Sequence, residues 1–198
     1  MQTGHVHVVR GLSGPARRGD GVRRDNGARG RGEDGMMIDD SAVRERVIEL
    51  LRGGNAAMTF EDAVAEYPME SINTNIPNGT YSSWHLLEHM RLAQRDILDF
   101  MTNAGYREPS WPQDYWPAPG TAATPEQWQK TIELFRADRA ALEQLAQDPA
   151  FDIVQQVPWG TGQTMLREFL LVADHNAYHL GEFGLLRLVM GTWPPGHV

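Results

Sequence analysis

Two pairs of histidines in this 198-residue chain are spaced four residues apart. His175 and His179 lie in the most apolar stretch of the chain, and His85 and His89 lie much earlier. Four residues make about one turn of an α-helix, so each pair projects from one helix face. Neutral imidazoles are common ligands of divalent metal ions. The spacing therefore predicts a metal site where the two segments meet.

Helical phase ranks these histidines as ligands. At about 100° per residue, His89 lies about 60° from the apolar stripe of its segment and His85 about 100° from it. His175 and His179 lie within about 40° of each other. We predict a site of three imidazoles, from His89, His175 and His179, with coordination positions left open for water or substrate. His85 is either a fourth ligand or a surface residue, and hydrogen-bonded core histidines are the alternative for the whole set.

Two carboxylates lie close to the histidines in the sequence. Glu182 follows His179 by three residues on the same helix face, so it can bind the metal, orient His179 or act as a general base. A solvated or ion-paired glutamate is the other interpretation. Glu88 lies about 160° from the apolar stripe and is expected to point outward. Asp174 and Tyr178 are out of phase with the histidines and are interpreted as flanking structure.

The elements that position these side chains are predicted to be helices. Each long segment repeats apolar residues at helical spacing, and Thr124 followed by Pro125 is typical of a helix start. Four long helices without an alternating β pattern predict an all-α, up-and-down four-helix bundle. The predicted helices span residues 39–52, 59–67, 82–103, 124–147 and 164–189.

A connection rich in Trp and Pro, residues 105–123, joins the second and third long helices. It contains Trp111, Tyr115 and Trp116. These rings either form a lid for an aromatic or apolar substrate or pack down to close one end of the bundle. The sequence leaves both interpretations open.

The N-terminal segment differs from the rest of the chain. Residues 1–35 hold nine glycines and seven arginines, and so few large apolar side chains that we expect disorder. Met36–Met37 stands at the change in composition, so the Gly/Arg-rich tail can be a start-site artefact, with residues 36–198 forming the domain. A basic arm that binds a partner is the rival interpretation.

Composition limits the partners of the protein. The net charge is −8 and there is one lysine, which argues against a nucleic-acid surface. With no cysteine, any metal must be held by nitrogen and oxygen. There is neither a continuous apolar run for a membrane span nor a secretory signal, so the sequence predicts a cytoplasmic protein without a membrane partner.

The helix order, the ligand histidine in the second long helix and the HxxxH pair in the last resemble the DinB/YfiT-like superfamily. The resemblance covers residues 37–195 in element order, and its specific parts are residues 82–100 and 174–187. It implies a DinB-like bundle with a histidine triad, His89, His175 and His179, that binds a divalent metal ion, commonly nickel or zinc. It also implies a homodimer.

Characterised members of this superfamily include transferases and an isomerase that use low-molecular-weight bacterial thiols. The resemblance thus implies a metal-dependent transferase that acts on a small-molecule substrate with such a thiol, and a chain without cysteine needs the sulfur from a cosubstrate. A metal-dependent hydrolase is an alternative, with Glu182 or Glu88 as proton acceptor. A stress-related module that binds metal or a small ligand without turnover is another.

Overall fold

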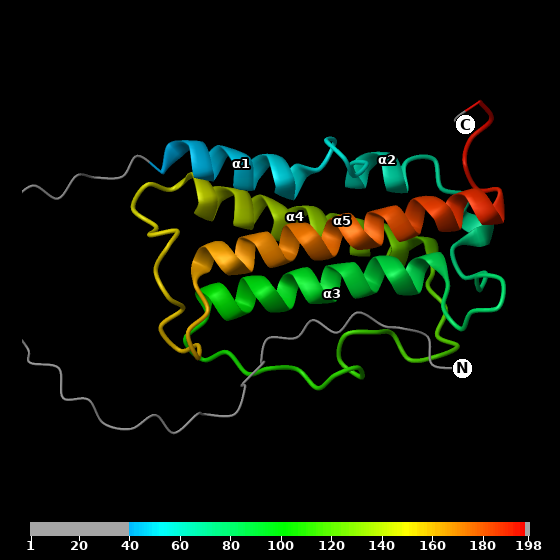
Figure 1. Cartoon of the computed structure of the whole chain (residues 1–198). Helices are drawn as coiled ribbons and strands as arrows, with labels where there is room; N and C mark the ends of the chain where they lie inside the picture. Colours follow the sequence, from blue (N-terminus) through cyan, green and yellow to red (C-terminus); the bar gives the residue numbers. More distant parts are fainter. Residues whose placement is uncertain (1–39, 197–198) are drawn as a thin grey trace, which may run out of the picture. The chain divides into compact units, whose positions relative to one another are not determined.

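The structure, a computed structural model, describes residues 40–196. The predicted disordered tail over residues 1–35 lies outside this range. Within it the chain is helical, which confirms the all-α class, and only two isolated β-bridges occur besides the helices. The helices are α1 (Ser41–Arg52), α2 (Phe60–Val64), a short 3-10 helix (Met69–Ser71), α3 (Ser83–Thr102), α4 (Pro125–Gln147) and α5 (Met165–Met190) (Figure 1).

Side-chain caps set the start of each of the three longest helices. Ser82, Thr124 and Thr164 precede α3, α4 and α5, and each side chain accepts a hydrogen bond from a backbone N–H in the first turn. Such a bond satisfies a donor that the helix itself leaves unpaired. Gly191, with φ of 64°, ends α5 in the left-handed region that glycine adopts without strain. The predicted boundaries of these three helices agree with the structure to within one residue because these signals are local, whereas the helix predicted over residues 59–67 ends at Val64.

Helices α1 and α3 each pack against both α4 and α5, and α2 packs against α5 (Figure 1). Side-chain bonds give the directions: Glu88 bonds Thr131 and Arg95 bonds Asp138, so α3 and α4 run the same way. The strict alternation of directions that we expected is therefore wrong between α3 and α4. Gln94 bonds Asn176 and His89 lies beside His179, so α3 and α5 run in opposite directions.

The connection between α3 and α4 explains this parallel pair. The 20 residues of α3 make a helix about 30 Å long, and residues 103–124 are enough to return along its full length. Tyr106 bonds Asp96, and the carbonyl of Ala118 lies beside His85, so the connection runs back along α3 toward its start. This path brings the Trp- and Pro-rich segment to His89.

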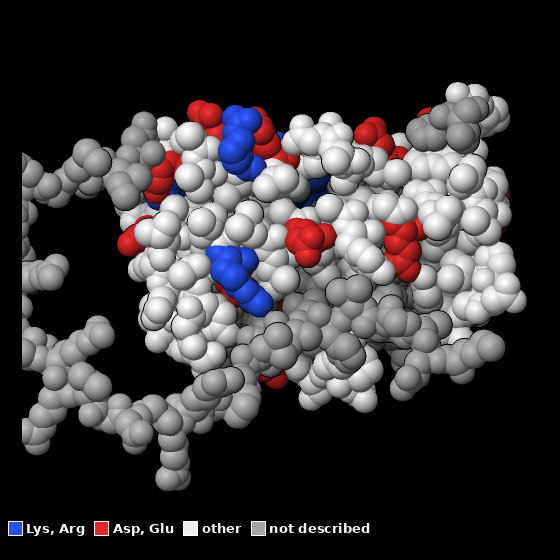
Figure 2. All heavy atoms as spheres, viewed as in Figure 1, with Lys and Arg blue, Asp and Glu red and all other residues white. Residues whose placement is uncertain are grey.

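Helix α5 has two unlike faces. One face is buried against the other helices and includes Phe169, Val172 and Phe183, all at most 1% exposed. The opposite face carries apolar side chains that are 45–62% exposed. These exposed residues are Leu170, Tyr178, Leu185, Leu188 and Val189. On the side of the molecule shown in Figure 2, charged side chains are sparse. None of the described helices combines the length and hydropathy needed to cross a membrane.

Candidate metal centre

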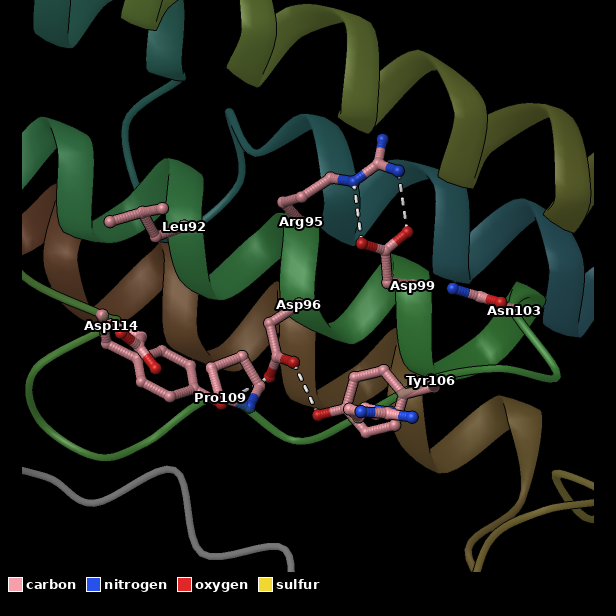
Figure 3. A pocket seen from close by; sticks show the side chains of 10 residues that line it. Leu92, Arg95, Asp96, Asp99, Asn103, Tyr106, Pro109 and Asp114 are labelled. Atoms are coloured by element: carbon pink, nitrogen blue, oxygen red, sulfur yellow. Dashed lines mark hydrogen bonds and ion pairs between the residues drawn. The ribbon is translucent and has the colours of Figure 1, made fainter.

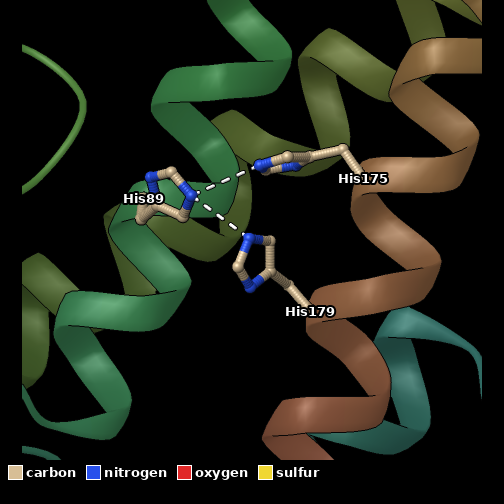
Figure 4. Close-up of side chains that lie close together, drawn as sticks. All are labelled: His89, His175 and His179. Atoms are coloured by element: carbon tan, nitrogen blue, oxygen red, sulfur yellow. Dashed lines mark hydrogen bonds between the residues drawn. The ribbon is translucent and has the colours of Figure 1, made fainter. Parts of the chain in front are cut away.

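The three predicted ligand histidines converge inside the protein. His89 projects from α3 toward His175 and His179 on α5 (Figure 4), and all three are at most 6% exposed. The Nε2 atom of His89 lies 3.2 Å from the Nε2 atoms of both His175 and His179. Metal–nitrogen bonds of about 2.0–2.1 Å at tetrahedral angles place ligand nitrogens about 3.3 Å apart. The observed spacing therefore fits nitrogens that share one ion.

Hydrogen bonds on the far side of two rings fix which nitrogen carries the proton. Nδ1 of His89 lies 2.8 Å from the backbone carbonyl oxygen of Tyr115, which can only accept, so this Nδ1–H donates. Nδ1 of His179 lies 2.7 Å from a carboxylate oxygen of Glu182 and donates in the same way. In the neutral rings both Nε2 atoms then carry lone pairs. These lone pairs face each other across 3.2 Å, an arrangement that a cation between them stabilises.

His175 completes the group with a neutral ring. Burial, together with its neighbours His179 and His89, holds the pKa of His175 well below its ordinary value. Its Nδ1 is buried and has no hydrogen-bond partner. Hydrogen bonds at Nδ1 thus orient two of the three imidazoles, His89 and His179, whereas Nδ1 of His175 makes none.

Glu182 occupies the position of a ligand-orienting carboxylate. Its Oε2 accepts the hydrogen bond from His179, and its Oε1 accepts one from the hydroxyl of Tyr81. Burial acts to raise the pKa of Glu182, but these two hydrogen bonds and the nearby imidazoles of His179 and His89 together lower it. Of the roles that the sequence left open, the geometry matches orientation of His179, because the carboxylate lies behind the ring rather than beside its Nε2.

His85 caps helix α3 and is not part of the group formed by the other three histidines. Its Nδ1 accepts from the backbone N–H of Ser82 at 3.3 Å and lies 2.8 Å from the Ser82 hydroxyl, which completes a capping box. Its Nε2 lies 3.4 Å from the carbonyl oxygen of Ala118. His85 is buried, so it is not the surface residue that the sequence allowed. Both of its ring nitrogens face capping or backbone groups, so it is not a fourth ligand either. Ser82 and His85 are at capping-box spacing, a signal that was readable in the sequence.

Glu88 does not point outward as expected. It pairs with Arg91 at 2.5 Å and accepts a hydrogen bond from Thr131 of α4 at 2.8 Å. Helix α4 covers this side of α3, which a phase angle for α3 alone cannot show. Asp174 and Tyr178 are exposed, in agreement with their predicted flanking positions.

The connection between α3 and α4 packs directly on the histidine cluster. The ring of Trp116 stacks on His89 with centroids 3.9 Å apart and planes 5° apart, and Trp111 lies edge-on at 6.3 Å. The carbonyl of Tyr115 accepts the hydrogen bond that orients His89. The connection thus forms a packed wall of the site. Sequence reasoning missed the Tyr115 carbonyl because any residue type supplies one.

A cavity of about 390 Å³ lies along α3 beside this wall (Figure 3). Asp96 lines this cavity and accepts hydrogen bonds from the hydroxyls of Tyr106 and Tyr115. Arg95 is held by Asp99 and by Asp138 of α4. The backbone of Tyr115 orients His89 while its side chain borders the cavity, so this residue links the two features.

Comparison of the chain with protein-family models, with curated proteins and with solved structures finds no match in any of the three. Within residues 40–196, His89, His175 and His179 are the one group of three or more metal-ligating side chains whose ligand atoms converge, all within 4.8 Å of one another. These residues can hold a metal ion.

Proposed function

We propose that the protein is a divalent-metal-dependent enzyme, with Ni²⁺ or Zn²⁺ held by His89, His175 and His179. The observation that carries the proposal is the pair of fixed tautomers, which directs lone pairs of His89 and His179 at each other in a buried space. Three protein ligands leave coordination positions for substrate, as in catalytic rather than structural sites.

We also propose that α1, α3, α4 and α5 form a DinB-like four-helix bundle. The mutual packing of these four helices supports this assignment, as does the position of the ligands on α3 and α5. The parallel direction of α3 and α4 is part of the proposed arrangement. It places the returning connection, with Tyr115 and Trp116, against the metal ligands.

The proposed reaction is transfer to or from a low-molecular-weight bacterial thiol. A divalent ion supplies Lewis acidity, which favours the thiolate form of a thiol whose ordinary pKa is about 8.5. The hydrolase alternative uses Glu182 or Glu88 as the proton acceptor for a metal-bound water. Both oxygens of Glu182 are engaged by His179 and Tyr81, and Glu88 is held by Arg91 and Thr131. The contacts of these two carboxylates therefore favour thiol chemistry over the metal-dependent hydrolase.

The test begins with protein purified without a histidine tag. Metal content is measured first, and then conjugation of a panel of bacterial thiols with small electrophiles. We expect near-stoichiometric metal and turnover that is lost in His175→Ala and kept in Asp174→Asn, an exposed neighbour of the ligand. Absence of bound metal contradicts the proposal. Bound metal without conjugation or hydrolysis would instead indicate a non-catalytic binding module.

The exposed apolar face of α5 supports a homodimer as the working assembly. The face includes Tyr178, Leu185 and Leu188, each more than half exposed. Such a group of exposed apolar side chains on one helix is uncommon on a surface that contacts only water. Light scattering on the purified chain measures the mass directly. We expect a dimer that dissociates in Leu185→Glu, whereas a monomeric wild-type protein contradicts this part of the proposal.

A further inference from the structure

We propose that Tyr81 is a positioning residue of the metal centre, acting on His179 through Glu182 and on His89 through Trp116. The inference rests on the proposed metal site and adds a residue from outside both ligand-bearing helices. Tyr81 was not singled out by the sequence, because it lies in a connection without helical periodicity.

The backbone around Tyr81 is held at the start of α3. Its carbonyl accepts a hydrogen bond from the N–H of Ile76 at 3.0 Å, and the next residue, Ser82, is the N-cap of α3. A β-bridge between Asn75 and Ser82 closes the same turn. The half-buried phenol is thus carried by a fixed segment, and it reaches across to α5.

The hydroxyl of Tyr81 controls the carboxylate that orients His179. It donates a hydrogen bond to Oε1 of Glu182, while Oε2 accepts the Nδ1–H of His179 at 2.7 Å. With both oxygens engaged, the carboxylate has one preferred rotation about its terminal bond. Loss of the phenol hydroxyl frees Oε1, so the carboxylate can turn away and release the ring of His179. The Nε2 lone pair would then no longer be fixed toward the other two histidines.

The ring of Tyr81 supports the second ligand. Its centroid lies 5.7 Å from that of Trp116, and Trp116 in turn stacks on His89 at 3.9 Å. Tyr81 therefore contacts both Trp116, which packs on His89 of α3, and Glu182, which orients His179 of α5. Replacement of tyrosine by phenylalanine removes only the hydroxyl and keeps the ring contact, so it separates the two effects.

The first test compares Tyr81→Phe with Tyr178→Phe in metal affinity. Tyr178 is the matched control, because its ring lies 4.9 Å from that of His179 but its side chain is 51% exposed. We expect Tyr81→Phe to weaken Zn²⁺ binding about 10-fold, at the lower end of the range for partners of metal ligands. The visible absorption of the Co²⁺-substituted protein should change in parallel. Equal Zn²⁺ affinities of the two variants would overturn the inference.

A double-mutant cycle with Glu182→Gln tests whether Tyr81 acts through Glu182. If it does, Tyr81→Phe causes no further loss of Zn²⁺ affinity once Glu182 has been replaced. Fully additive losses would mean that the hydroxyl acts by another route and would overturn the proposed mechanism of positioning.

A third measurement keeps the inference separate from the proposed function. The ring ¹⁵N shifts of His179 report its tautomer in the metal-free protein. We expect the Nδ1–H form in the wild type and a mixture of tautomers in Tyr81→Phe. An unchanged tautomer overturns the positioning role even if metal binds, whereas failure of the wild type to bind any metal overturns the proposed function.

Discussion

Helix α5 contributes to two buried polar centres that differ in how their hydrogen bonds are satisfied: the histidine cluster, which it shares with α3, and Arg187. Arg187 is fully buried, and its guanidinium donates to the carbonyls of Ala63, Ala65 and Thr192 at 2.6–2.9 Å. It also lies 3.9 Å from the centroid of the Trp193 ring. The terminal nitrogens of the guanidinium are therefore matched by protein carbonyls, and Nε is left without a hydrogen-bond partner.

The histidine cluster is the reverse case. Its outer nitrogens on His89 and His179 are bonded to the protein, but the inner Nε2 atoms face one another. Donors meet acceptors around Arg187, whereas acceptors meet acceptors between the imidazoles. The carbonyls around Arg187 are matched inside the chain, whereas the imidazoles leave acceptors that a bound cation would match.

The largest expected loss of stability follows from replacing Arg187. Arg187→Met leaves three carbonyls without their donor and removes a cation from the Trp193 ring, so we expect about 3–5 kcal/mol less free energy of unfolding. Urea denaturation measures it. Zinc affinity under folding conditions should stay within about twofold of wild type, and a large loss of affinity would contradict the separation of the two centres.

Removal of a ligand histidine should have the opposite effect, a large loss of Zn²⁺ affinity with little change in stability. His179→Ala takes one of three donors from the site, so we expect at least a 100-fold loss of Zn²⁺ affinity, beyond the range for partners of ligands. The metal-free variant should unfold at nearly the same urea concentration as the metal-free wild type. The substitution removes the packing of the imidazole, but it also removes the repulsion between the Nε2 lone pairs of His179 and His89, and the two effects offset each other. Isothermal titration and denaturation together test this, and unaltered Zn²⁺ affinity would exclude the site.

Metal should stabilise the wild type and leave the ligand variant unchanged. Zn²⁺ at about 100 times its dissociation constant adds about 2.7 kcal/mol to the free energy of unfolding. A thermal melt with and without Zn²⁺ measures the gain, and chelator should reverse it. An equal gain in His179→Ala would place the ion elsewhere.

A smaller effect concerns pH and His85. Burial lowers the pKa of His85, so below about pH 6.5 the unfolded chain binds a proton that the folded protein does not, and stability falls as pH falls. Glutamine at this position can still form the capping box. We expect the metal-free His85→Gln variant to match wild type at pH 7.5 and to lose less stability at pH 5.5. Identical losses at pH 5.5 would contradict this role.

The smallest expected effect is at the surface. Lys130 and Glu133 form an exposed ion pair at 3.8 Å on α4. Such pairs contribute about 0–1 kcal/mol, so Lys130→Ala should change the free energy of unfolding by less than about 0.5 kcal/mol and leave Zn²⁺ affinity unaltered. It serves as the baseline against which the other variants are measured.

Local signals explain what the sequence could predict. The caps Ser82, Thr124 and Thr164 lie next to the helices they start, and the i, i+4 spacing of His175 and His179 needs only helix geometry. The choice of His89 over His85 came from phase within one helix. All of these depend on residues that are close in the sequence.

The features that sequence reasoning missed depend on distant parts of the chain. The path of residues 103–124 sets α3 parallel to α4, and nothing periodic in that segment encodes its direction. Glu88 turned out to face α4, and Tyr81 and the Tyr115 carbonyl reached the site from connections. Side-chain periodicity describes one helix at a time, so contacts supplied by neighbouring helices and loops lie beyond it.

The contact between His89 and His175 also bears on local unfolding of the protein. The two residues are 86 positions apart in the sequence, on helices that run in opposite directions. An ion shared by them closes a long loop, so α3 and α5 can separate only after it dissociates. Amide hydrogen exchange in both helices should then slow together when metal is bound, and the two helices would behave as one cooperative unit of unfolding.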